Sequence, residues 1–141
     1  MWERTTVYLE FGGTIRQPEW EELRGELSQR LNYVGAQADG SFSAEEPEAA
    51  FGNLNEQVTT LLQEHDLTYK WWSDSIGDFG GTLHWWSPGD AFDTWVSQVD
   101  GEPILTLSDL ERLPRYPFGF RRLDDLITKL TPPVIPPLEV I

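Results

Sequence analysis

The residues of this chain that could act as a general base are its two histidines, His65 and His84. A catalytic base needs a partner that orients it, and no such partner can be identified beside either residue. His65 falls where a helix should end, so interaction with the helix dipole or simple solvation explains it. His84 alternates with tryptophans in a strand-like segment. The chain also has no cysteine, which excludes a thiol nucleophile, a thiolate metal site and a disulfide framework.

Two short motifs suggest ligand loops, but each lacks the pattern its chemistry needs. The segment from Asp74 to Asp78 carries two carboxylates without the ligand spacing or the terminal glutamate of an EF-hand. Gly12-Gly13 stands between a strand and a helix, as in phosphate-binding loops. The helix after it opens with glutamates, which would repel phosphate. We therefore predict no metal, no cofactor and no catalytic residue, and a carboxylate-based enzyme is the least favoured alternative.

Charge is the strongest functional signal of the sequence. Asp and Glu number 24 against 10 Lys and Arg, for a net charge of −14. Such a chain repels nucleic acids and anionic membranes and attracts basic partners. Glu19, Glu22 and Glu26 fall on one solvent-facing stripe of a predicted helix, and Asp74 and Asp78 fall beside a predicted hairpin tip. Carboxylates spaced in this way could imitate a phosphate backbone. Solubility or adaptation to high salt would explain the same excess of acid.

The seven tryptophans are the second signal, because four of them form the adjacent pairs Trp71–Trp72 and Trp85–Trp86. Side chains alternate along a strand, so each pair should place one indole on each face of a sheet. A hairpin centred near residues 78 and 79 would set Trp71 opposite Trp86 and Trp72 opposite Trp85. One face should meet the helices, and the other should need a cover or a partner.

Hydrophobic spacing predicts the elements that position these residues. Two amphipathic helices are expected, from Pro18 to about residue 32 or 35 and from Glu48 or Asn53 to His65. Residues 35–48 read as a loop. Strands are expected at 6–11, 67–72, 82–86, 94–99 and 104–105, a short helix begins near residue 108, and a last helix covers 121–130.

The predicted fold class is α+β, an antiparallel sheet packed on one face by two main helices, with a short helix and a Pro-rich C-terminal extension. Residues 1–130 should form a single domain, followed by the Pro-rich tail 131–141. Val134, Ile135 and Leu138 of the tail are expected to cover apolar sheet surface.

Three segments, 7–13, 67–74 and 100–103, resemble a group of small acidic bacterial hypothetical proteins with no assigned activity. The resemblance therefore implies no site residues. By size and charge alone, the chain also resembles phage or plasmid anti-defence proteins and toxin-immunity proteins.

These observations predict a non-enzymatic, cytoplasmic protein that binds and inhibits a basic, nucleic-acid-handling partner. That partner would be a nuclease or a CRISPR-type complex, with DNA mimicry as one mode of inhibition and antiviral defence as the setting. The chain itself should bind neither nucleic acid nor membrane. The alternative is a module that binds a small molecule or peptide on a Trp-lined sheet face. The predicted partner-binding residues are Glu19, Glu22, Glu26, Asp74, Asp78, Trp71, Trp72, Trp85 and Trp86.

Overall fold

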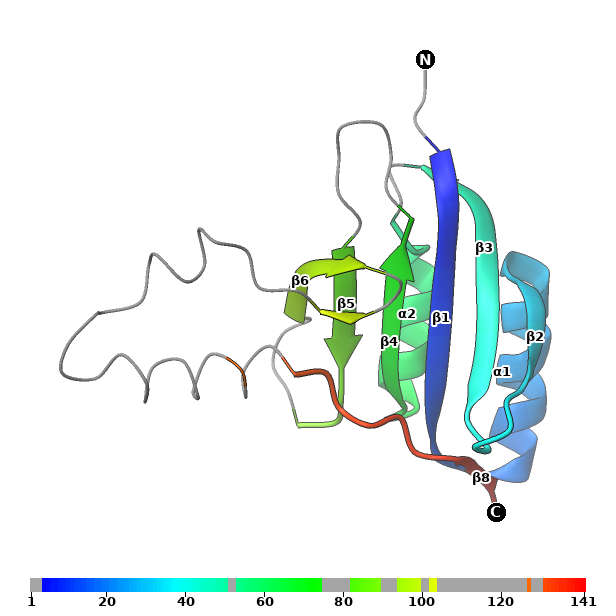
Figure 1. Cartoon of the computed structure of the whole chain (residues 1–141). Helices are drawn as coiled ribbons and strands as arrows, with labels where there is room; N and C mark the ends of the chain where they lie inside the picture. The colour runs from blue at the N-terminus through cyan, green and yellow to red at the C-terminus, as the bar shows by residue number, and fades with distance from the viewer. Residues whose placement is uncertain are drawn as a thin grey trace, which may run out of the picture.

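A computed structural model of the chain describes residues 4–50, 53–74, 82–89, 94–99, 102–103, 127 and 131–141. These residues form two helices and eight strands (Figure 1). In chain order the elements are β1 (Arg4–Ile15), α1 (Gln17–Arg30), β2 (Asn32–Ala36), β3 (Phe42–Ala50), α2 (Glu56–Glu64), β4 (Thr68–Ser73), β5 (Thr82–Trp86), β6 (Thr94–Val99), β7 (Glu102–Pro103) and β8 (Leu138–Val140).

The strands make one sheet in the order β2-β3-β1-β4-β5-β6-β7, and each of these neighbours is antiparallel. Strand β8 pairs in parallel with the end of β1. Both helices lie behind the sheet in the view of Figure 1. The predicted α+β class, with two main helices on one face of an antiparallel sheet, is therefore confirmed.

The side chains of β1 alternate between the two faces of the sheet. Val7, Leu9 and Phe11 are fully or almost fully buried and belong to the main core. That core also contains Trp20, Leu23 and Leu27 of α1 and Val58 and Leu62 of α2. Tyr8 and Glu10 point to the other side of the sheet. We call the side packed by α1 and α2 the helix face and the other side the open face.

Three of the four helix ends carry a local signal in the sequence or the backbone. Pro18 stands in the first turn of α1, as expected, and α1 ends at Arg30. Helix α2 begins later than predicted, after Asn55, whose side chain accepts a hydrogen bond from the Gln57 N–H at 2.8 Å. At its end, Asp66 takes the left-handed conformation with φ 55, and Leu67 N–H bonds to Leu62 O at 3.0 Å. This is a Schellman motif with Asp in the place that usually holds Gly.

The loop predicted for residues 35–48 is wrong, because the chain forms the hairpin β2–β3 there. Strand β3 has few of the residues that favour strands, and it contains Pro47. Its position is instead determined by long-range pairing, which sets Ala44 opposite Leu9 and Phe42 opposite Phe11 of β1. Glu46 of β3 also accepts the Asn55 N–H at 2.8 Å, and this bond ties the strand to the start of α2.

The predicted register of the tryptophan hairpin is also wrong, by two residues. Trp71 lies opposite His84 and Trp72 opposite Leu83, while Trp86 lies opposite Tyr69 and Trp85 opposite Lys70. In this register the rings of Trp71 and His84 stack at 3.9 Å, and those of Tyr69 and Trp86 stack at 6.0 Å. A slip of two residues moves no side chain to the other face. The expectation that each pair contributes one indole to each face is therefore confirmed.

The C-terminal segment 131–141 lies against the end of β1 and the β2–β3 turn. Pro137 O accepts the Gly13 N–H at 3.2 Å, and Leu138 N–H donates to Gly40 O at 2.9 Å. Ile135 is buried and Leu138 packs on the core, but Val134 is 92% exposed, so its predicted covering role is wrong. Ile141 O also accepts the first N–H of α1, from Gln17, at 2.8 Å.

The predicted strand at 104–105 and the predicted short helix near 108 lie outside the described residues, as does most of the helix predicted at 121–130. Ile127, the one residue of that last segment that is described, is helical, as predicted, and 46% exposed. Among the described residues, no helix is both long enough and apolar enough to cross a membrane.

Replacing Gly12 by Ala should destabilise the protein, because a Cβ on Gly12 would overlap the carbonyl group of Pro136. We expect a loss of about 1–3 kcal/mol in the free energy of unfolding, typical of overpacking. Gly25→Ala is the matched control, since nothing lies within 4 Å of a Cβ at this helical position. It should stabilise the protein by up to about 1 kcal/mol. Chemical denaturation of both variants tests this. Equal stabilisation by both would show that Pro136 does not lie against Gly12.

Replacing Asp66 by Gly should stabilise the protein by about 1 kcal/mol, because Gly adopts positive φ without steric cost. Asp66→Asn removes the charge but keeps a side chain that tolerates this conformation, whereas Asp66→Ala should destabilise. Thermal unfolding at neutral pH ranks the three variants. A gain for Asn equal to that for Gly would assign the effect to charge near the helix end rather than to the backbone.

Candidate functional site

The four paired tryptophans separate into two buried and two open-face residues. Trp71 and Trp86 belong to the core beneath the helices, with 4% and 9% of their surface exposed. Trp72 and Trp85 lie on the open face, where they pack with Leu83. Trp85 is 5% exposed and Trp72 is half-buried. Of the four, Trp72 therefore presents the most accessible ring to a partner.

Trp72 lies in a group of aromatic and charged side chains that the pairing of β1 with β4 brings together. Tyr8 is directly opposite Trp72, and the two rings stack at 5.7 Å with an interplanar angle of 29°. The Tyr8 hydroxyl donates a hydrogen bond of 3.0 Å to Oδ2 of the exposed Asp74. Glu45 of β3 lies opposite Tyr8 on its other side. We call this group the aromatic–acidic patch; its members are Tyr8, Glu10, Glu45, Lys70, Trp72 and Asp74.

Lys70 is the single cation of the aromatic–acidic patch. It lies opposite Glu10, and its Nζ is 3.4 Å from Glu10 Oε2. The same Nζ lies 5.6 Å from the centre of the Trp72 ring, within the range of a cation–π interaction. Lys70 thus neutralises Glu10 and leaves Asp74 and Glu45 as the excess negative charge of the patch.

The neighbours of the Tyr8 hydroxyl determine its protonation state. The hydrogen bond to Asp74 raises the pKa of Tyr8 above its ordinary value, and burial and the charges of Asp74 and Glu45 act in the same direction. Tyr8 therefore stays protonated at neutral pH and remains a donor to Asp74. This bond orients the Asp74 carboxylate beside the stacked rings.

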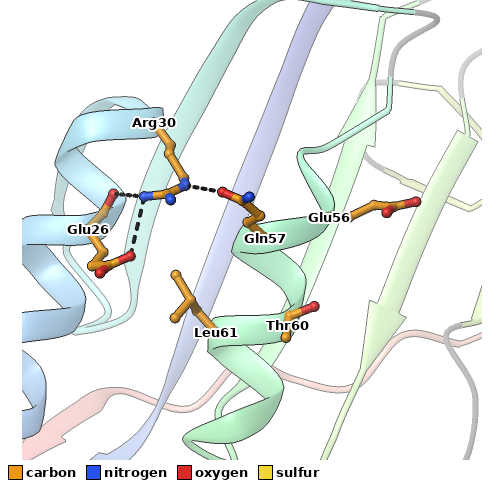
Figure 2. Close-up of a pocket in the computed structure, with 6 residues that line it drawn as sticks. All are labelled: Glu26, Arg30, Glu56, Gln57, Thr60 and Leu61. Atoms are coloured by element: carbon orange, nitrogen blue, oxygen red, sulfur yellow. Dashed lines mark hydrogen bonds and ion pairs between the residues drawn. The ribbon is translucent and has the colours of Figure 1, made fainter.

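The predicted glutamates lie on the opposite side of the molecule. Glu19 and Glu22 are exposed on α1, and Glu26 is bound to Arg30 at 3.3 Å. We call these three residues the α1 ridge. Beside it, between α1 and α2, is an open pocket of about 360 Å³. Figure 2 shows Leu61 pointing into it and Arg30 bridging Glu26 and Gln57; the other lining residues are Glu56 and Thr60.

The structure therefore does not join the predicted partner-binding residues into one site. The α1 ridge belongs to the helix side, whereas Asp74, Trp72 and Trp85 belong to the open face. Trp71 and Trp86 are enclosed between sheet and helices. Asp78 lies outside the described residues. Sequence reasoning missed four members of the patch, because only the pairing of β1 with β4 and β3 places them there: Tyr8, Glu10, Lys70 and Glu45.

Neither histidine lies in an arrangement that suggests catalysis. His84 lies flat against Trp71, and His65 Nδ1 is 4.0 Å from Glu19 Oε2 at the surface. Within the described part of the chain, no group of three or more His, Cys, Asp or Glu could hold a metal ion. The chemistry that both surfaces offer is electrostatic and aromatic binding.

No protein-family model, no curated protein and no solved structure matches this chain. The resemblance to small acidic bacterial proteins therefore stays a prediction.

The turn between β2 and β3, where Gly40 O accepts the Leu138 N–H of the tail, should make the stability of the protein depend on pH. Asp39 Oδ1 accepts bonds from the Ser41 hydroxyl at 2.6 Å and from the Ser41 N–H at 2.9 Å. These bonds lower the pKa of Asp39, and the Lys70 charge adds to this effect. The stability they contribute is complete above the carboxyl's ordinary pKa and is lost as pH falls through the lowered value.

Asp39→Asn should accordingly lower the melting temperature at neutral pH, and the difference from the wild type should close in acid. The control is Glu22→Gln, which removes one charge from an exposed helical site. Melting curves over a pH series provide the measurement. A difference that persists unchanged at low pH would mean that the Asp39 charge does not stabilise the turn.

Proposed function

We propose that this protein binds a basic, nucleic-acid-handling protein and inhibits it without catalysing a reaction. A nuclease or a CRISPR-type complex fits the chemistry, and the role would be that of an anti-defence or immunity protein in the cytoplasm. The net charge of −14 carries the proposal, because it favours a cationic partner over nucleic acid or anionic lipid.

Three cations of the described residues are held by contacts within the chain, and this supports the proposal. Arg30 pairs with Glu26 and Lys70 pairs with Glu10. The guanidinium of Arg24 lies 6.0 Å from the Trp20 ring and 5.9 Å from the Phe42 ring. These three cations are held by internal contacts, while Glu19, Glu22 and Asp74 are exposed. The outward negative charge is therefore free to attract a basic surface.

Electrostatic capture predicts that the association rate depends on the α1 ridge. Changing Glu19, Glu22 and Glu26 together to Lys should slow association with the purified partner several-fold and flatten its salt dependence, because long-range attraction acts before contact. The partner is first isolated from the native host and must be a basic protein whose nuclease or binding activity the wild type inhibits.

The matched control changes Glu21, Glu64 and Glu139 to Lys, three exposed positions outside the ridge. It alters the net charge equally. Equal slowing in both triple variants would assign the effect to overall charge rather than to the ridge. Unchanged association rates in both, across a salt series, would rule out electrostatic capture.

The second candidate is a module that binds a peptide or small molecule on the open face. The half-buried Trp72, stacked on Tyr8, favours it. In that case acidity would serve solubility, and binding would be nearly independent of salt. Salt dependence of the measured affinity therefore separates the two functions.

A further inference from the structure

We propose that the aromatic–acidic patch is the docking surface for the basic partner and that it receives an arginine side chain of that partner. This inference rests on the proposed function, which requires a cationic partner and assigns the α1 ridge to long-range attraction before contact, but assigns no residue to the contact itself. It places the contact on the open face, opposite the α1 ridge.

The patch already holds one cation in the manner that the proposal requires. The Lys70 ammonium lies 5.6 Å from the Trp72 ring centre and 3.4 Å from Glu10 Oε2, so ring and carboxylate together bind a positive group. Trp72 is held in place by its stacking on Tyr8 and by its packing beside Leu83 and Trp85. A partner thus meets an aromatic surface that is already ordered, which reduces the entropic cost of binding.

The remaining charges favour a guanidinium over an ammonium group. Glu10 is neutralised by Lys70, but Asp74 is exposed and directed by the Tyr8 hydroxyl. A carboxylate beside an aromatic ring suits the planar guanidinium, which can stack on the ring and donate two hydrogen bonds to the carboxylate. A lysine ammonium is a compact point charge and gains less from this geometry.

Charge complementarity also selects this occupant over others. A second copy of the chain would bring another net charge of −14 to the surface, and nucleic acid would bring phosphates; both would be repelled. The C-terminal segment of this chain lies over Gly12, farther along β1, and leaves Tyr8 and Trp72 half-buried and Asp74 exposed. An arginine carried by a basic protein remains the occupant that the patch suits.

The test compares hexa-arginine with hexa-lysine as defined probes, with the full chain and at low salt. Calorimetry measures affinity, and the indole N–H signals of the ¹⁵N-labelled protein report the location. We expect hexa-arginine to bind at least ~3-fold more tightly than hexa-lysine, the scale of one exposed cation–π contact. The Trp72 indole signal should shift, while those of Trp71 and Trp86 in the core should stay in place.

Two variants connect this preference to the patch. Trp72→Leu should remove the preference for arginine while keeping an apolar side chain. Asp74→Asn, at an exposed position where folding is not at risk, should weaken hexa-arginine binding more than the control Glu22→Gln, which removes the same charge from the α1 ridge. Equal weakening by both would show that the carboxylate acts only through net charge and would overturn the proposal.

The outcomes separate this inference from the proposed function. If both peptides bind equally, with strong salt dependence and no shift of the Trp72 signal, the arginine site is wrong while capture of a basic partner stands. If neither peptide binds even at low salt, the electrostatic basis of both proposals fails. Tight hexa-arginine binding that survives both Trp72→Leu and Asp74→Asn would place the contact elsewhere and also overturn the inference.

Discussion

The structure depends on the pairing of β1 with its neighbours. This strand lies between β3 and β4, and its end also pairs with β8, so nearly every residue from Arg4 to Ile15 has a partner. Because its side chains alternate, the same pairing sends Val7, Leu9 and Phe11 into the core and Tyr8 and Glu10 to the open face. Core and patch therefore cannot change independently: a slip of one residue would exchange them.

The end of β1 also couples the tail to the first helix. Arg16, at the N-cap position of α1, provides no side-chain cap, and Ile141 O accepts the Gln17 N–H instead. The small residues Gly12 and Gly40 leave room for Pro136 and Pro137 of the same segment. A polyproline-like stretch cannot form a regular ladder, since proline lacks an N–H. It docks through a carbonyl group that accepts a hydrogen bond and by filling space, and the ladder with β1 begins only at Leu138.

The sequence was sufficient for features that depend on local periodicity. Hydrophobic spacing predicted α1, whose Trp20, Leu23 and Leu27 lie in the core, and alternation predicted which tryptophans share a face. The sequence was insufficient for features that depend on pairing between distant segments. Residues 42–50 have weak strand propensity and become β3 through β1. Likewise, Tyr8 and Trp72 are far apart in the chain, and no local sequence pattern predicts their contact. Four of the six patch residues therefore depend on the registers of β1 with β4 and β3, which the sequence does not specify locally.

Lys70 offsets part of the negative charge on the open face of the sheet. Glu10, Glu45 and Asp74 project from neighbouring strands, and like charges this close oppose folding. Lys70 relieves part of that repulsion by pairing with Glu10. It also limits the cost of docking, because a carboxylate that is buried without a partner is strongly unfavourable. The patch carboxylates without a cation are Asp74, which accepts the Tyr8 hydroxyl, and Glu45, which lies opposite Tyr8 on β3. A guanidinium that bonds to Asp74 would pair one of these two carboxylates, whereas a neutral ligand would leave both without a cation.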